Sequence, residues 1–199
     1  MPREDEREIK EEKAVEEMVE KPMSDGAIKE ALPNAKIILY NELKNYNSID
    51  QILPHSKSYA IILYQNSPNS GHWVGISRPN KNTIEVFDSY GNPIDKPLSW
   101  ISKNENIKLG IDGPYLTNLL NKSGYNVIHN TTCFQGKNGD ISTCGRHACF
   151  RIKCMLDKNM DLEKYTKMMK NVKNSMNKTF DELVAIMLNT PTEQKEIKF

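Results

Sequence analysis

The sequence predicts an α+β fold, with a small central mixed β-sheet and helices packed against it. Short apolar segments typical of strands are concentrated in the first two thirds of the chain, and amphipathic helical patterns fill the last third. This order favours an α+β domain over a parallel wound sheet. At 199 residues the chain suits a single domain with one sizeable core.

The N-terminal segment differs in composition from the rest. Residues 1–22 are mostly charged and almost free of apolar side chains, which predicts a solvated helix or a disordered arm. The alternative is a processed leader or docking segment, whose deletion would change targeting or activation and leave the chemistry intact. Residues 23–199 are expected to form the single domain. Within it, Ser24 is expected to cap a short helix that runs through Leu32 and is stopped by Pro33.

Five strands are expected, at residues 35–40, 59–64, 72–77, 83–88 and 125–130. The second is apolar on both faces, which predicts a buried central strand. In the fourth, alternation places Ile84, Val86 and Asp88 on one face and Glu85 and Phe87 on the other. A short turn joins the third strand to the fourth, so the pair can bring His72 and Asp88 side by side.

Four longer helices are expected, and each has its own signals. The first has Pro114 at its first helical position, a leucine face and Gly124 beyond its end. The second begins near Gly145 and carries one buried stripe formed by Ala148, Cys149, Ile152, Met155 and Leu156. The others cover about 161–172 and 180–189. The last opens with a capping box, Thr179 with Glu182, and is stopped by Pro191.

Bulk properties exclude several classes of protein. Apolar content is 38% and charged content 27%, and the net charge of +1 gives no field strong enough to predict nucleic-acid binding. No run of eighteen apolar residues exists, so no membrane span is expected. Because the first twenty residues are charged, a secretory signal is not expected. The protein is therefore predicted to be intracellular, or packed inside a particle assembled there.

The cysteines are expected to be free thiols. Cys133, Cys144, Cys149 and Cys154 could form two disulfides, but a reducing compartment favours the thiols. No Cys-x-x-Cys pair occurs, and adding the neighbouring histidines produces no zinc-like spacing. We therefore expect neither a metal nor another cofactor.

Four residues in chain order predict the chemistry: His72, Asp88, Gln135 and Cys144. A thiol nucleophile needs an imidazole to take its proton, a group to orient that imidazole, and a donor for the developing oxyanion. Cys144 is predicted at a helix N-terminus, where unpaired amides favour a thiolate. His72 would be the general base and then the acid, and Asp88 would hold its productive tautomer. Gln135 would donate its amide to the oxyanion beside the Cys144 backbone N–H.

Each assignment has a structural alternative. Cys144 could be a buried structural cysteine, a role that suits Cys149 and Cys154 better. His147 is the rival base, but its position three residues after Cys144 points it away from the site. Glu85 is a poor substitute for Asp88, because it lies on the other strand face. Asp88 could also serve as a turn-starting residue, and Gln135 as an ordinary polar loop residue.

Four sequence segments together resemble the adenain and SUMO-protease superfamily of cysteine peptidases: Gly-His-Trp-Val at 71–74, Phe-Asp-Ser-Tyr-Gly at 87–91, Gln135, and Thr-Cys-Gly at 143–145. The stretch Ser-Pro-Asn-Ser-Gly-His-Trp-Val at 67–74, followed by Phe-Asp-Ser-Tyr-Gly at 87–91, looks closest to maturation proteases of virophages, polinton-like elements and related large DNA viruses. The resemblance covers roughly residues 24 to 157. It implies a papain-like, circularly permuted core with the order His-Asp-Gln-Cys, so that residues 23–199 would form a cysteine protease domain.

The same resemblance implies a substrate and a setting. Trp73 would wall a narrow cleft that admits a glycine-containing peptide, with Gly145 leaving room for the substrate carbonyl; Trp73 could equally be a core aromatic. The implied function is a monomeric cysteine endopeptidase that cleaves viral capsid precursors next to glycine, in the virion and the viral factory of the host cytoplasm. Relatives can depend on DNA or a peptide activator, and four lysines give one helix some basic character: Lys164, Lys167, Lys170 and Lys173.

Three other functions remain open on the sequence. The residues alone imply only acyl transfer from a thiolate. A deubiquitinase or deSUMOylase acting on host ubiquitin-like conjugates would keep the chemistry and change the substrate. An acetyltransferase of the bacterial effector type would use similar His, acidic and Cys residues. An inactive binding module is disfavoured by the intact His72, Asp88 and Cys144.

Overall fold

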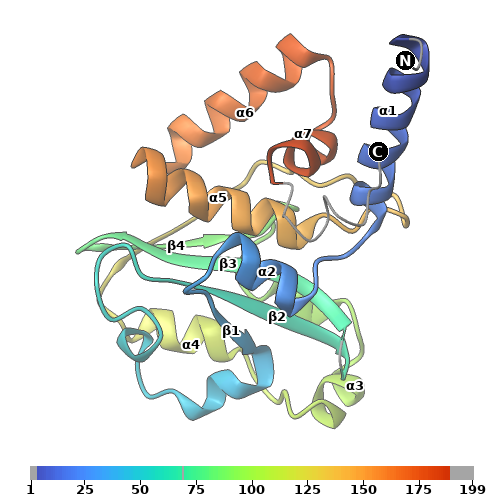
Figure 1. Cartoon of the computed structure of the whole chain (residues 1–199). Helices are drawn as coiled ribbons and strands as arrows, with labels where there is room; N and C mark the ends of the chain where they lie inside the picture. Colours follow the sequence, from blue (N-terminus) through green and yellow to red (C-terminus); the bar gives the residue numbers. More distant parts are fainter. Residues whose placement is uncertain (1–3, 69, 189–199) are drawn as a thin grey trace.

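The computed structural model describes residues 4–68 and 70–188, and a five-stranded mixed sheet forms its centre (Figure 1). The strands are β1 (Lys36–Leu39), β2 (Tyr59–Ser67), β3 (Ser70–Asn80), β4 (Thr83–Phe87) and β5 (Asn126–His129). They lie side by side in chain order. The pairs β1–β2 and β4–β5 are parallel, and β2–β3 and β3–β4 are antiparallel. The predicted α+β class with a mixed sheet is therefore confirmed, as are all five strands within a few residues.

Helices cover both faces of the sheet (Figure 1). On one face α4 (Tyr115–Asn121) packs its leucines against Ala60 and Ile62 of β2. On the other face α5 (Cys144–Lys158) and α2 (Asp25–Ala31) pack against Ile61 and Leu63 of the same strand. Strand β2 is thus apolar on both faces because each face has its own core.

The C-terminal helices form a further layer over α5. Helix α6 spans Leu162–Met176 and α7 spans Phe180–Met187. Their inner faces share a third cluster with Phe87 and Phe134. The predicted capping box is present, because Thr179 accepts from the Glu182 amide and Glu182 accepts from the Thr179 amide. The predicted stop at Pro191 and the last predicted helical residue, Asn189, lie outside the described residues.

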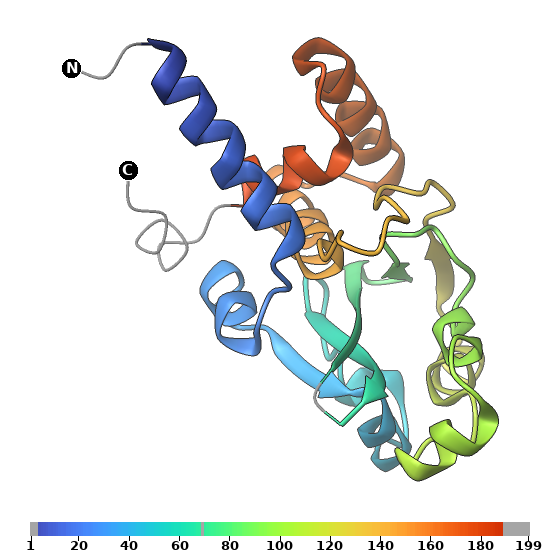
Figure 2. The same cartoon turned by 90° about the vertical axis from the view of Figure 1, so that its right-hand side faces the viewer.

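Helix α1 (Glu4–Glu20) is solvated over its first half and packed over its second. Ala14 and Met18 are buried, and the helix lies against α7 (Figure 2). The predicted solvated arm is therefore correct only as far as Lys13. After α1, Ser24 caps α2 by accepting a hydrogen bond from the Ala27 amide, as predicted.

Short elements complete the fold. The 3₁₀ turns η1 (Tyr40–Asn45) and η2 (Ile49–Gln51) connect β1 to β2. The 3₁₀ turn η3 (Lys96–Ser99) and the helix α3 (Lys103–Lys108) connect β4 to α4. Pro114 is the residue before α4 rather than its first helical residue. Among the described residues, no helix is both long and apolar enough to cross a membrane.

Candidate active site

His72 and Asp88 meet at one end of the β3–β4 pair. Gly75 lies opposite Phe87 in the register, so continuing the antiparallel pair carries β3 back to His72 and β4 forward to Asp88. His72 Nε2 lies 2.9 Å from Asp88 Oδ1, and both side chains are buried. The predicted juxtaposition is confirmed. Glu85 lies on the opposite face, as expected, where it binds Arg151.

Cys144 lies close enough to the His72 ring to influence its protonation. Burial alone would lower the pKa of His72, but interactions with Asp88 and Cys144 raise it to about 9. Because Nε2 is directed to Asp88, Nδ1 is the nitrogen left for the sulfur. Cys144 is the first residue of α5, as predicted, and 8% of it is exposed. The structure thus brings together a thiol, an imidazole and a carboxylate.

The Asp88 carboxylate also organises the turn that follows β4. Its Oδ1 accepts the Tyr90 amide at 2.8 Å and its Oδ2 accepts the Asn92 side chain at 3.2 Å. Its backbone exchanges two hydrogen bonds with the side chain of Asn130. Gly91 has a φ of +69°, and a Cβ there would lie 2.8 Å from the backbone of Thr131. The turn-starting alternative and the predicted orienting role of Asp88 are therefore compatible.

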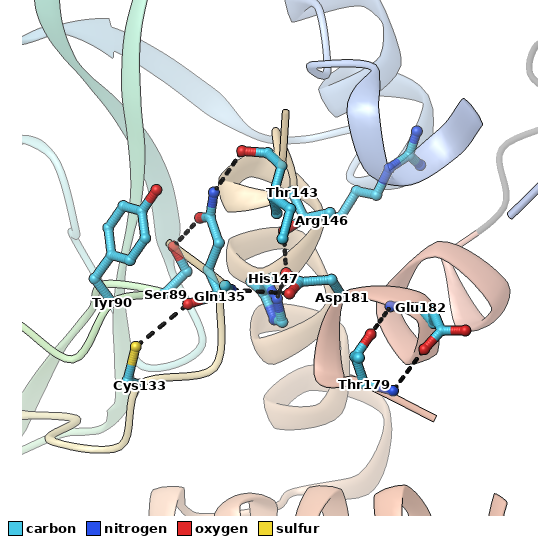
Figure 3. Close-up of polar contacts among 12 residues, drawn as sticks. Ser89, Tyr90, Cys133, Gln135, Thr143, Arg146, His147, Thr179, Asp181 and Glu182 are labelled. Atoms are coloured by element: carbon cyan, nitrogen blue, oxygen red, sulfur yellow. Dashed lines mark hydrogen bonds and ion pairs between the residues drawn. The ribbon is translucent and has the colours of Figure 1, made fainter. Parts of the chain in front are cut away.

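Gln135 is held in a fixed orientation beside the residue after Asp88 (Figure 3). Its Oε1 accepts the Ser89 hydroxyl at 2.7 Å, and its Nε2 donates to the carbonyl of Ile141 at 3.2 Å. The Gln135 backbone amide also donates to the carbonyl of Ser89 at 2.9 Å. An amide nitrogen carries two hydrogens, so one Nε2–H remains beyond the bond to Ile141. Gln135 is therefore buried, and hydrogen bonds hold its side chain in one orientation.

Trp73 and Gly145 pack against each other at the start of α5. Trp73 belongs to the same buried cluster as Cys144, and its indole nitrogen donates to the carbonyl of Met23 at 3.1 Å. A Cβ on Gly145 would lie 3.0 Å from the Met23 Cβ and 3.1 Å from Trp73 Cδ1. The core-aromatic alternative for Trp73 is therefore present in the structure. The Cβ position at Gly145 faces Met23 and Trp73, so close packing is one reason for glycine there.

Two aromatic rings that the sequence analysis did not single out cover His72. The Tyr90 ring stacks on the imidazole, with centroids 5.1 Å apart, and the Trp100 ring meets it edge-on at 5.0 Å. Burial, followed by the charges of Cys144 and Asp88, raises the pKa of Tyr90 to about 12, so it stays a neutral phenol. Trp100 is 46% exposed despite its size. Tyr90 already lies in the Phe-Asp-Ser-Tyr-Gly segment, whereas no sequence signal marks Trp100.

His147, the rival base, has a carboxylate partner of its own but no exposed surface. Its Nε2 lies 3.0 Å from Asp181 Oδ1, and the ring is fully buried. Burial lowers the pKa of His147 in spite of that partner. The pair is a buried structural contact under the first turn of α5, so the structure favours His72 as the base. Asp181 was missed because nothing in the sequence links α7 to this region.

The remaining cysteines differ from Cys144. Burial raises the pKa of Cys149 to about 12 and that of Cys154 to about 11, so both are thiols in ordinary conditions. Cys133 is exposed, and its sulfur contacts the Gln135 carbonyl at 3.3 Å. Over the part of the chain that the structure describes, all four are free, and no group of three His, Cys, Asp or Glu side chains is arranged to hold a metal.

Comparison with known proteins places the chain in a viral family. No family model matches the chain. An uncharacterized protein of the Sputnik virophage, V9, is 33% identical over 167 residues, which cover 83% of this chain and 93% of V9. Identity at this level over nearly the whole of both chains reflects common ancestry. The chain therefore belongs to the family of the virophage protein V9, a family of viral proteins.

Proposed function

We propose that this protein is a cysteine endopeptidase. One observation supports the proposal above all: His72 is hydrogen-bonded to Asp88, and Cys144, at the N-terminus of a helix, is close enough to the same ring to raise its pKa. This is the arrangement that activates a thiol for attack on a carbonyl. The His-Asp-Gln-Cys order and the mixed sheet are compatible with a permuted papain-like core, which we include in the proposal.

The proposed reaction starts from a thiolate–imidazolium pair. The Cys144 sulfur attacks the peptide carbonyl, and the negative charge that forms on its oxygen is stabilised by Gln135 Nε2–H and the Cys144 backbone N–H. One such donor contributes about 3 kcal/mol to lowering the barrier. The His72 imidazolium then protonates the leaving amine, and the same ring removes a proton from the water that hydrolyses the acyl-enzyme. No step needs a metal or another cofactor.

The proposed substrates are viral capsid precursors, cut next to glycine during particle maturation. Two facts support this choice: the motifs at 71–74 and 87–91 resemble maturation proteases, and the V9 family is viral. The virion and the viral factory of the host cytoplasm are the proposed locations. We propose that the enzyme acts as a monomer, since all of the proposed reacting groups come from one chain.

The experiment is co-expression with the capsid precursor from the same genome, using the wild type, Cys144→Ala and the matched control Cys149→Ala. Mass spectrometry would locate new termini. We expect cleavage next to glycine in the wild type and in Cys149→Ala, and none in Cys144→Ala. An intact precursor in all three, with turnover of a fluorogenic ubiquitin-like C-terminal substrate, would replace capsid precursors by ubiquitin-like conjugates as the substrate. Cleavage that persists in Cys144→Ala would refute the proposed nucleophile.

A further inference from the structure

The carboxylate of Asp181 collects hydrogen bonds from three separate positions around the proposed oxyanion site (Figure 3). Its Oδ2 accepts the Gly136 amide at 2.9 Å. Its Oδ1 accepts the Thr143 hydroxyl and lies 3.0 Å from His147 Nε2. The carboxylate is buried, and it projects from the first turn of α7. One side chain therefore ties α7 to the Gln135 loop and to the start of α5.

The bond to Gly136 affects the residue next to Gln135, the predicted oxyanion donor. Gly136 follows Gln135, so fixing its amide fixes the backbone from which the Gln135 side chain extends. The approach is close, because a Cβ on Gly136 would lie 3.2 Å from Asp181 Oδ2 and 2.5 Å from the Ile141 side chain. Ile141 supplies the carbonyl that Gln135 Nε2 contacts. The loop is therefore held from both ends.

The bond to Thr143 fixes the residue that precedes Cys144, whose backbone N–H is the second proposed donor. Thr143 is the residue before α5, where a threonine hydroxyl ordinarily accepts a hydrogen bond from an amide of the first turn. Here the hydroxyl donates to Asp181, and the Thr143 side chain makes no capping bond to the helix. The amides that a capping threonine would bind belong to Gly145 and Arg146, and the Thr143 side chain bonds to neither. Uncapped amides at this position can serve a thiolate or an oxyanion.

The Asp181 carboxylate is ionised, so it accepts hydrogen bonds and donates none. Burial by itself raises the pKa of Asp181, but hydrogen bonds from His147, Thr143 and Gly136 outweigh it and hold the pKa below its ordinary value. Burial keeps His147 neutral, with Nε2–H as the donor to the carboxylate. An asparagine would present an NH₂ group to at least one of these donors. The isosteric change should therefore disrupt the network while keeping its shape.

We infer that Asp181 is a positioning residue of the proposed protease, holding the Gln135 loop and the start of α5 so that the two oxyanion donors converge. The inference rests on the proposed function. It assigns a role to a residue in α7, beyond the region of residues 24–157 that resembles known proteases. Asp181 itself touches no reacting atom, and it acts through Gly136 and Thr143.

The test compares Asp181→Asn and Thr143→Val with the control Glu182→Gln, which changes the neighbouring carboxylate of α7 and leaves the Asp181 contacts intact. Each variant is assayed with a cleaved peptide, with a peptide nitrile and with iodoacetamide. The nitrile forms a thioimidate whose nitrogen occupies the place of the oxyanion, whereas alkylation by iodoacetamide needs only the thiolate.

In Asp181→Asn we expect kcat to fall about 10-fold to 100-fold, which is less than the loss caused by deleting an oxyanion donor outright. KM and the alkylation rate should stay within about twofold, and nitrile affinity should fall with kcat.

A double-mutant cycle with Gln135→Ala separates positioning from general structural damage. If Asp181 acts through Gln135, then Asp181→Asn should cost much less in the Gln135→Ala background than in the wild type. Equal losses in both backgrounds would overturn the inference. If Asp181→Asn does not fold, the Thr143→Val variant tests the inference instead. An unchanged kcat in Thr143→Val would then overturn the inference.

The two proposals fail in different ways. A wild type that neither cleaves peptides nor alkylates selectively at Cys144 would remove the proposed function, and the inference with it. A wild type that does both, beside an Asp181→Asn variant with unchanged kcat and nitrile affinity, would remove the inference alone.

Discussion

The indole nitrogen of Trp73 donates a hydrogen bond to the carbonyl of Met23, which ties the residue after the proposed base to the segment between α1 and α2. The carbonyls of two residues in α1 also accept hydrogen bonds from residues close to Cys144 in the chain. The Ser142 amide donates to Val19 at 2.8 Å, and Arg146 Nε donates to Met18 at 3.0 Å. The chain on both sides of Cys144 is therefore hydrogen-bonded to the N-terminal region.

These contacts predict that the N-terminal segment is needed for stability. Deleting residues 2–20 removes the buried Met18 side chain, worth about 1.5–3 kcal/mol, and the carbonyls of Met18 and Val19. We expect the unfolding temperature to fall by several degrees, and peptide cleavage to slow because the start of α5 loses its support. Differential scanning fluorimetry and a peptide assay would measure both. Deleting only residues 2–10, well before the first buried residue of α1, is the control and should change neither. Equal behaviour of the two deletions would favour a removable leader.

The raised pKa of His72 predicts an alkaline limit to activity. Interactions with Asp88 and Cys144 overcome the effect of burial and raise this pKa from 6.5 to about 9, so the imidazolium persists up to that pH. Cleavage should decline as pH rises through about 9. The protonated ring also stabilises the fold fully below pH 6.5, and that contribution is lost as pH rises through about 9.

The Cys144→Ala variant provides the matched measurement for His72. Removing the sulfur removes one of the two groups that raise the His72 pKa, while Asp88 remains. NMR titration of the imidazole should therefore give a lower pKa in Cys144→Ala than in the wild type. An unchanged value would show that the thiolate and the imidazolium do not interact.

Asp88→Ala is predicted to reduce kcat strongly but less than Cys144→Ala does. The carboxylate orients His72 and supports its charge, a role whose loss costs up to about 10⁴-fold in comparable triads. The control is Asn92→Ala, which removes one hydrogen bond to the same carboxylate and should cost far less. Steady-state kinetics and a thermal melt would be recorded for each variant. Complete loss in Asp88→Ala, equal to that of Cys144→Ala, would mean that Asp88 mainly supports the turn.

The buried pair of Glu85 and Arg151 is predicted to govern stability rather than chemistry. Arg151 Nε and one terminal nitrogen each lie 2.7 Å from a Glu85 carboxylate oxygen, with both side chains buried. Changing Glu85 to Gln alone leaves the guanidinium charge unbalanced and should cost about 3–5 kcal/mol in urea unfolding. The double variant Glu85→Gln with Arg151→Met should recover much of that loss. A single variant as stable as the wild type would contradict the prediction.

Much of the fold could be predicted because its signals are local. Alternation in residues 83–88 places Asp88 and Glu85 on opposite faces, and the structure confirms it. The capping residues Ser24 and Thr179 mark the starts of α2 and α7. Helix α3 was missed because it is short and polar, so it has no apolar periodicity.

The rest of the candidate site depends on contacts between distant segments. Met23 fills the space beside Gly145, and Asp181 reaches across from α7 to Gly136. Sequence spacing cannot predict such contacts, because they depend on how α1 and α7 pack on α5. The four residues of the proposed chemistry could be named in advance, whereas the residues that hold them in place could not.

The packing of α1 on α7 has a consequence for when the thiol becomes competent. Helix α1 precedes all four proposed catalytic residues in the chain, and α7 follows them. A nascent chain that has emerged from the ribosome only as far as Cys144 lacks α7, and with it Asp181 and the surface that receives Met18. We therefore expect the nucleophile to stay dormant during synthesis and to gain activity only when folding joins these two distant helices.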